Sequence, residues 1–530
     1  MRLYGLIILL ITFAVTGVRH VCASTTPFAV AETLPPDVTS FVHVSHPSEL
    51  RRTSSGTLLQ QFGRFTMFGD EFDAVWSQLA ARAGVSSEEL FDICFGSSFT
   101  MAMRDTAGAD REWVVIGRAN GDRLDDILKR LRPEAHLPRF GFALMHLPES
   151  AIIVARDGDR IVAAPRARSN LLNDTLRRMD RSHDEVLARD SVMTAFADDR
   201  EEGRIAAWIR TAAPNPGAIG VVASIENQTL TAHVRGAFAA APFTRTRTER
   251  SWDASMVGRF EHDALFIMME PTDVDGGPMP GILRSVFGEP WPGMSQTGPV
   301  GDSRMFILSD TEGRLRDDPV DLRLPTLTMV VPTTGNPRRS EHLLDRKMLR
   351  ITDALLEQAR NPDEKARIVA TETFHPNEAR HIDLDLLTAP LARSMPLFSE
   401  LSMNWQSIAM GNGQSAWVMA THPLALESTC DALCSPDRWA GPMIGAWQNV
   451  GTFNGVRLSR HLRSYADRPD LLADGEDAEA FREVLGLCAD LTSCIDLGRW
   501  RLTRPEDTTF VMDVELQLIK APSAGAASDD

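Results

Sequence analysis

The feature that most constrains this chain is a pattern of strands, turns and helices that occurs twice. A Gly-led strand predicted at 97–104 in the first half has a counterpart at 303–309 in the second. Downstream of each lies a predicted hairpin, with an Asp157-Gly158 turn in the first half and an Asn412-Gly413 turn in the second. Each hairpin leads into a predicted helix. The common order predicts a duplicated architecture, and chance similarity of two unrelated halves is the alternative.

The periodicity of apolar residues predicts an α+β fold, with two divergent copies of a mostly antiparallel sheet covered by helices. The first repeat is assigned to residues 32–240 and the second to residues 250–520. The final stretch, residues 521–530, consists mostly of small and polar residues and is predicted to be disordered.

The N-terminus has the composition of a secretory signal. An uncharged, mostly apolar run at 3–18 follows Arg2, and small residues precede Ser24 at the positions that a signal peptidase reads. The run is shorter than the ~20 residues that a membrane-spanning helix needs. Residues 1–23 are therefore predicted to be a cleaved signal peptide, which would make the protein periplasmic or extracellular. The alternative is an uncleaved signal anchor that tethers the chain by its N-terminus.

Charge narrows the class of partner. The formal net charge is −17, and an acidic chain repels phosphate backbones, so nucleic acid is excluded as a partner. The sequence contains no phosphate-binding glycine loop, haem-attachment motif or calcium loop, so no cofactor is predicted. The partner stays unknown, and an exported chain would meet a protein or polymer of the cell envelope.

Cysteines cluster late in the chain. Four of them form two close pairs, Cys430 with Cys434 and Cys488 with Cys494. In an exported protein this clustering predicts two disulfides of unassigned connectivity. Zinc is the alternative, but Cys-x3-Cys with Cys-x5-Cys is not a common zinc spacing. Cys94 lies in an apolar run and is predicted to be a buried free thiol.

A family resemblance follows from several short motifs. They are the run Leu34-Pro35-Pro36-Asp37, the strand beginning at Phe41, the Asp157-Gly158 hairpin and the paired halves. The chain resembles exported bacterial proteins catalogued as a domain of unknown function, which have a Leu-Pro-x-Asp strand signature and a duplicated strand–helix–strand unit. The resemblance implies an extracytoplasmic, duplicated protein and supplies no catalytic residues.

The sequence offers few candidate catalytic residues or metal ligands. Gly301-Asp302-Ser303 is similar to an esterase nucleophile motif, but no Asp-x-x-His follows it, and a serine without a base is inert. His381, Asp383 and Asp385 share one strand face, which is more typical of a solvated strand than of a metal site. We therefore predict no catalytic residue and no metal ligand.

Trp291 is the single candidate binding residue. It lies in a Pro- and Gly-rich loop at 288–301, where an aromatic side chain can anchor a partner or plug the core. The sequence thus favours a non-enzymatic binding or structural protein. The rival is a hydrolase-like or metal-dependent enzyme whose site is assembled from scattered histidines and carboxylates.

Overall fold

The computed structural model places the chain in two compact units. Unit 1 comprises Met1–Pro242 with Thr508–Asp530, and unit 2 comprises Phe243–Asp507. The residues that the structure describes are 28–49, 69–105, 111–119, 121–147, 152–166, 170–180, 185–197, 203–211, 216–226, 228–240, 250–260, 263–271, 303–312, 323–333, 341–344, 346, 372–374, 379–383, 402–411, 414–435, 443–447, 449–468, 476–506 and 508–519.

The strands do not form the two helix-covered sheets that the sequence predicts. One antiparallel sheet contains 20 of the described strands, and β11 (Arg250–Asp253) with β19 (Met443–Trp447) forms a separate two-stranded sheet. The predicted fold class is therefore wrong. Periodicity reveals single strands, whereas sheet membership depends on partners far apart in the chain. Within unit 1, for example, His233 pairs with Asp513.

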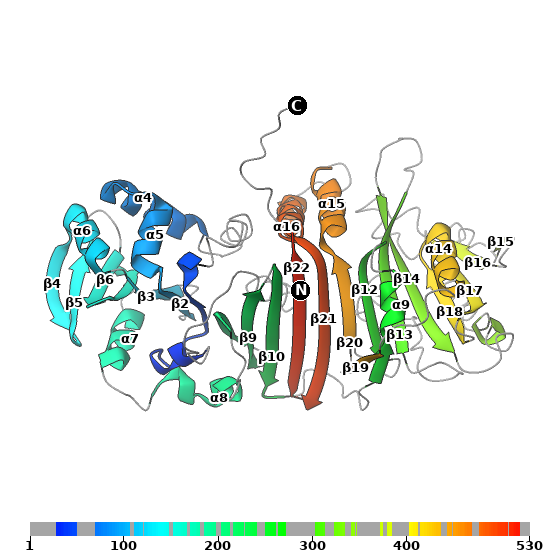
Figure 1. Ribbon diagram of the computed structural model, residues 1–530, viewed down its shortest axis with the longest axis horizontal. Coiled ribbons are helices and arrows are strands. Elements are labelled where there is room, and N and C mark those ends of the chain that lie inside the picture. The colour runs from blue at the N-terminus through cyan, green and yellow to red at the C-terminus, as the bar shows by residue number, and fades with distance from the viewer. Residues whose placement is uncertain are drawn as a thin grey trace. The chain divides into compact units, whose positions relative to one another are not determined.

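Unit 1 holds eleven strands in an order set by their pairing (Figure 1). From one end the order is β4 (Glu134–Arg139), β5 (Phe142–His146), β6 (Ile152–Asp157), β7 (Arg160–Pro165), β3 (Arg111–Arg118), β2 (Ser98–Asp105), β1 (Ser40–Ser45), β8 (Ile205–Thr211), β9 (Gly217–Glu226), β10 (Thr229–Phe238) and β22 (Thr509–Leu518).

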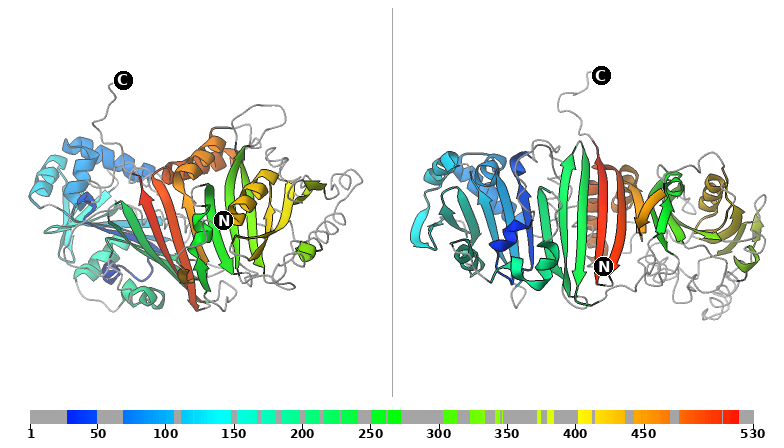
Figure 2. Two further views of the ribbon diagram at one scale, coloured as in Figure 1. Left: turned by 45° about the vertical axis from the view of Figure 1, so that its right-hand side comes forward. Right: turned by 60° about the horizontal axis from the view of Figure 1, so that its bottom comes forward.

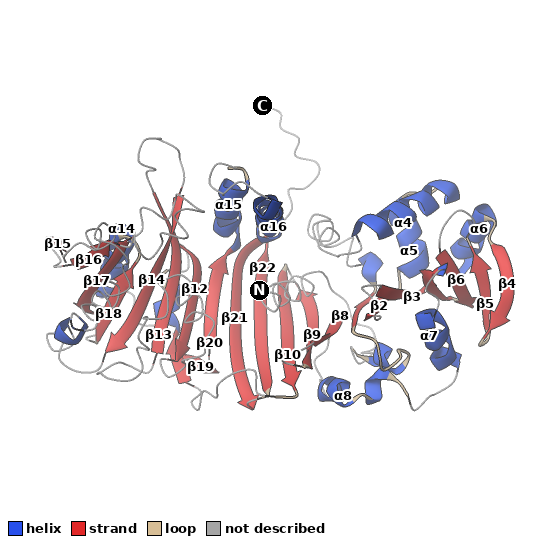
Figure 3. Ribbon diagram, turned by 180° about the vertical axis from the view of Figure 1, so that it is seen from behind, coloured by secondary structure: helices blue, strands red, loops and turns tan. Residues whose placement is uncertain are grey.

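Helices flank both faces of the β1–β7 part of this unit. Neighbouring residues of β3 point to opposite faces, as strand geometry requires. Val114 packs in a buried cluster with Leu171 and Leu176, and Val115 in another with Leu90 and Leu124. Seen from behind, α4 (Gly69–Ala83), α5 (Ser87–Phe95) and α6 (Gly121–Leu131) lie above these strands, and α7 (Asn170–Asp180) and α8 (Ser191–Ala197) lie below (Figure 3).

Unit 2 has nine strands of the large sheet. Their order is β15 (Glu372–Phe374), β16 (Ala379–Asp383), β17 (Ser402–Ala409), β18 (Ser415–Ala420), β14 (Arg323–Thr333), β13 (Ser303–Glu312), β12 (Ala264–Pro271), β20 (Asn449–Asn454) and β21 (Ile495–Glu506). The described helices are α9 (Ala254–Gly258), α14 (Pro423–Cys434), and α15 (Gly455–Ala466) and α16 (Glu476–Thr492), which pack on each other (Figure 2).

The strand order of unit 1 recurs in unit 2. Reading from β4 to β9 gives 4-5-6-7-3-2-1-8-9, and reading from β15 to β21 gives 15-16-17-18-14-13-12-20-21. The strand predicted at 97–104 is β2, and its predicted counterpart at 303–309 is β13, at the matching place. Among the described helices, none is long and apolar enough to cross a membrane.

Candidate functional site

The β4–β5 hairpin of unit 1 is the most exposed regular structure of that unit. All six residues of β4 are exposed, whereas Phe142, Leu144 and His146 of β5 are buried. Among the described strands, β4 pairs with β5 alone, and Figure 1 shows it at the end of the unit's strands. Pro138 suits this position, because a proline without an N–H is tolerated in an edge strand. β5 thus anchors the hairpin in the core and β4 faces solvent.

Two large apolar side chains project from this hairpin. Leu137 is 85% exposed and Phe140 is 38% exposed. Phe140 and Gly141 form the turn, with φ of +50° and +78°. A two-residue hairpin turn of this kind needs positive φ at both positions and favours Asn or Gly. A bulky L-residue there costs on the order of 1 kcal/mol. The turn therefore presents an aromatic ring at a strained position.

The hairpin also gathers the kinds of side chain that bind metal ions. One potential ligand atom each from Glu134, His136 and His146 lies within 4.8 Å of the other two. Glu134 and His136 are two apart on β4 and so share a face, and His146 is the cross-strand partner of Glu134. The imidazole rings of His136 and His146 meet edge to face, with centroids 6.1 Å apart.

His146 is the buried member of the group, at 8% exposure. Its Nε2 lies 3.3 Å from Nη1 of Arg166. Because a guanidinium only donates, Nε2 accepts, and the ring proton of neutral His146 is on Nδ1. That Nδ1 is buried, and in the described part of the chain it has no hydrogen-bond partner. The nearest carboxylate oxygen, Oε2 of Glu134, is 3.7 Å away.

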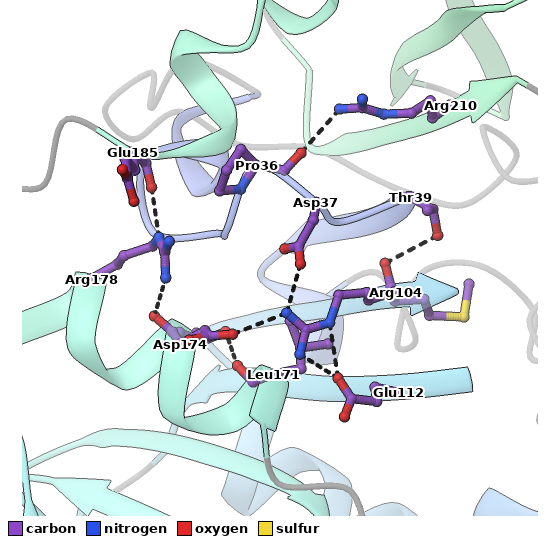
Figure 4. Close-up of polar contacts among 12 residues, drawn as sticks. Pro36, Asp37, Thr39, Arg104, Glu112, Leu171, Asp174, Arg178, Glu185 and Arg210 are labelled. Carbon is purple, nitrogen blue, oxygen red and sulfur yellow. Dashed lines mark hydrogen bonds and ion pairs between the residues drawn. The ribbon is translucent and has the colours of Figure 1, made fainter. Parts of the chain in front are cut away.

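A second cluster of charges surrounds Arg104 of β2 (Figure 4). Its guanidinium donates to Glu112 from Nε at 2.9 Å and also from Nη2. Nη1 donates to Asp37 at 2.8 Å and to Asp174 at 3.0 Å. Burial alone would lower the pKa of Arg104, but the hydrogen bonds that Arg104 donates to Glu112, Asp174 and Asp37, together with the charge of Asp37, outweigh burial and raise that pKa. The three carboxylates share one permanent cation, which suits a structural clamp rather than proton transfer.

This clamp explains the Leu34–Asp37 motif. Leu34 is fully buried, and its carbonyl oxygen accepts from the Leu187 amide at 2.8 Å. The carbonyl of Pro36 accepts a hydrogen bond from Arg210 at 3.0 Å. The carboxylate of Asp37, the last residue of the motif, accepts one from Arg104. The motif fastens the entry of β1 to Leu187, to β8 and to β2, so its residues have a structural role.

The cysteine prediction needs correction. All five described cysteines are free thiols, so no disulfide joins Cys430, Cys434, Cys488 and Cys494. The two pairs of cysteines stay apart from each other because their helices pack on different elements. Cys430 and Cys434 lie on α14, against Gln406 and Ala409 of β17. Cys488 lies on α16, which packs on α15, and Cys494 lies just after α16.

The remaining sequence candidates are placed as follows. Trp291 lies outside the described residues. Ser303 begins strand β13, as expected for a Gly-led turn into a strand rather than for a nucleophile. His381 and Asp383 lie on β16, and Asp385 lies outside the described residues.

Sequence reasoning missed the β4–β5 hairpin and its ligand group. A signal was present, because Glu134-x-His136 places two ligands on one strand face and Phe140-Gly141 ends the alternation at a turn. The cross-strand position of His146 depends on register, which the sequence leaves open.

No family model, curated protein or solved structure matches this chain. The resemblance to the exported family therefore stays a prediction.

Proposed function

We propose that this protein is an exported, non-enzymatic binding protein of the cell envelope, and that the β4–β5 hairpin is its contact surface. The observation that carries the proposal is the 85% exposure of Leu137 on an edge strand. Phe140 adds an aromatic ring at the adjoining turn. Export is supported by the apolar run at 3–18.

An exposed edge strand is normally protected against association. Natural proteins shield such edges with charges, bulges or covering segments. β4 has two such features, Pro138 and a bulge between His136 and Arg139, yet it presents Leu137 to solvent and the turn presents Phe140. Burial of exposed apolar area is the dominant favourable contribution to most protein–protein association, and a few well-packed side chains supply most of the binding free energy. The chemistry fits a polypeptide segment that buries the side chains of Leu137 and Phe140, since the bulge and Pro138 interrupt the backbone pairing that a continuous added strand would need.

A metal-dependent enzyme is the second candidate, because Glu134, His136 and His146 converge. Two of the three are exposed residues of an edge strand, whereas catalytic metal sites lie in shaped, water-restricted cavities. The geometry therefore supports binding better than catalysis.

Site-specific photocrosslinking in intact cells tests this proposal. A photoreactive amino acid replaces Leu137 in one strain and Val484 of α16, which is 53% exposed, in a control strain. We expect a discrete adduct with an envelope protein from position 137 and none from position 484. The proposal fails if position 137 gives no adduct, if both positions give the same adducts, or if the protein stays in the cytoplasmic fraction.

A further inference from the structure

We propose that Glu134, His136 and His146 bind a divalent transition metal ion of the zinc class between β4 and β5. This is a binding site in addition to the apolar contact surface, and it stands on its own observations. Two imidazoles and one carboxylate form a ligand set that zinc sites use, with a fourth position left open.

The strand geometry places the ligands on one face. Glu134 and His136 alternate with Ala135, so their side chains leave β4 on the same side. His146 stands directly across from Glu134 in the register of the hairpin. Three ligands held by two hydrogen-bonded strands need little reorganisation of the backbone when an ion binds.

The spacing within the group fits an ion better than a hydrogen bond. Nδ1 of His146 and Oε2 of Glu134 are 3.7 Å apart, beyond hydrogen-bonding distance. Two ligand atoms at ~2.0–2.1 Å from a tetrahedral zinc ion lie about 3.3 Å apart. For this pair a shift of a few tenths of an ångström suffices, and His136, whose ligand atom lies within 4.8 Å of the other two, would complete the site by a side-chain rotation. Nδ1 is buried without a partner among the described residues, and an ion would satisfy it.

Arg166 opposes metal binding in the structure as it stands. It donates to Nε2 of His146, which keeps the ring proton on Nδ1, the atom that would bind the ion. Zinc at Nδ1 requires the other tautomer, whose Nε2 proton would point at the Arg166 guanidinium, so Arg166 has to move away before the ion binds. Arg166 is exposed and can swing into solvent. It therefore competes with the ion, and removing it should tighten binding.

The ion class follows from the donors. Imidazole suits zinc, copper, nickel and iron, whereas calcium and magnesium select oxygen-only sites. The probe is therefore Zn²⁺ itself, with Co²⁺ as its spectroscopic substitute.

The experiment measures Zn²⁺ binding to the full exported protein by competition with a chromogenic chelator. His136→Ala removes an exposed ligand with little risk to folding. Val484→Ala, at an exposed position of α16 outside the hairpin, is the control, and Arg166→Ala tests the competition. We expect His136→Ala to weaken one site at least about tenfold, because even an outer-shell partner contributes that much. Arg166→Ala should tighten the same site several-fold, and Val484→Ala should leave it unchanged.

Zinc bound by the free cysteines is present equally in all four proteins, so the difference between them isolates this site. The Co²⁺ complex should lack strong thiolate absorption. Identical zinc binding by wild type and His136→Ala overturns the proposal, and so does weaker binding by Arg166→Ala. Crosslinking at position 137 in chelator-treated cells is independent of this outcome, so either proposal can fail alone.

Discussion

Arg104 of β2 stands directly across from Glu112 of β3, and its Nε and Nη2 both donate to Oε2 of that glutamate. The Glu112 side chain is 6% exposed. The pair connects β2 with β3, and β3 contacts both α5 and α7. Arg104 also donates a hydrogen bond to Asp37 of the Leu-Pro-Pro-Asp motif.

Removing the positive charge of Arg104 should destabilise the protein strongly. Arg104→Met leaves Glu112 buried without its counter-charge, and the loss should be about 3 kcal/mol of unfolding free energy. Asp37→Asn is the control, because Asp37 is 58% exposed and exposed ion pairs contribute less than about 1 kcal/mol. Urea unfolding measures both. A loss below about 1 kcal/mol for Arg104→Met would show that the cluster is not a clamp.

His43 should make stability depend on pH. Burial lowers the pKa of His43 from 6.5 to about 4, and its Nδ1 lies 2.8 Å from Oγ1 of Thr100. Between these pKa values the unfolded chain binds a proton that the folded chain does not. Stability therefore rises with pH across this window and is lost as pH falls from 6.5 toward 4.

The matched variant for this prediction is His43→Gln, which keeps a polar side chain but does not titrate. Between about pH 7 and about pH 4.5, wild type should lose about 2 kcal/mol more unfolding free energy than the variant. Equal losses in the two proteins would refute the role of His43.

The cysteines should be reduced and unequal in reactivity. Burial raises the pKa of Cys94 and of Cys430 to about 12, so neither forms the reactive thiolate near neutral pH. Cys434 is exposed. Timed alkylation with mass mapping should label Cys434 first and Cys94 and Cys430 last. Disulfide-linked peptides in the non-reduced protein would contradict this expectation.

Local patterns predicted single elements well. The helix expected after the Asp157-Gly158 hairpin is α7, and the hairpin itself is β6–β7 with Gly158 at φ +60°. Both follow from chemistry within a few residues, namely an amphipathic stripe and a left-handed turn. The predicted two sheets failed because pairings such as His233 with Asp513 connect distant parts of the chain.

The candidate site was less predictable still. All six residues of β4 are exposed, so its short alternation of polar and apolar residues does not correspond to a core-facing side. Its importance rests on the exposure of Leu137 and on the register that brings Glu134 to His146. Neither property is local. The disulfide prediction relied on compartment and spacing, and the packing of α14 and α16 determined the outcome.

The central claim is that the β4–β5 hairpin is built for binding. Phe140→Asn tests it most directly, with unfolding free energy and crosslinking from position 137 measured on the same protein. Asn tolerates the left-handed turn, so relief of about 1 kcal/mol of strain should offset the packing lost with the ring. We predict stability within about 1 kcal/mol of wild type and a much weaker adduct. A loss of about 3 kcal/mol or more, typical of a core phenylalanine, or an undiminished adduct would contradict the account.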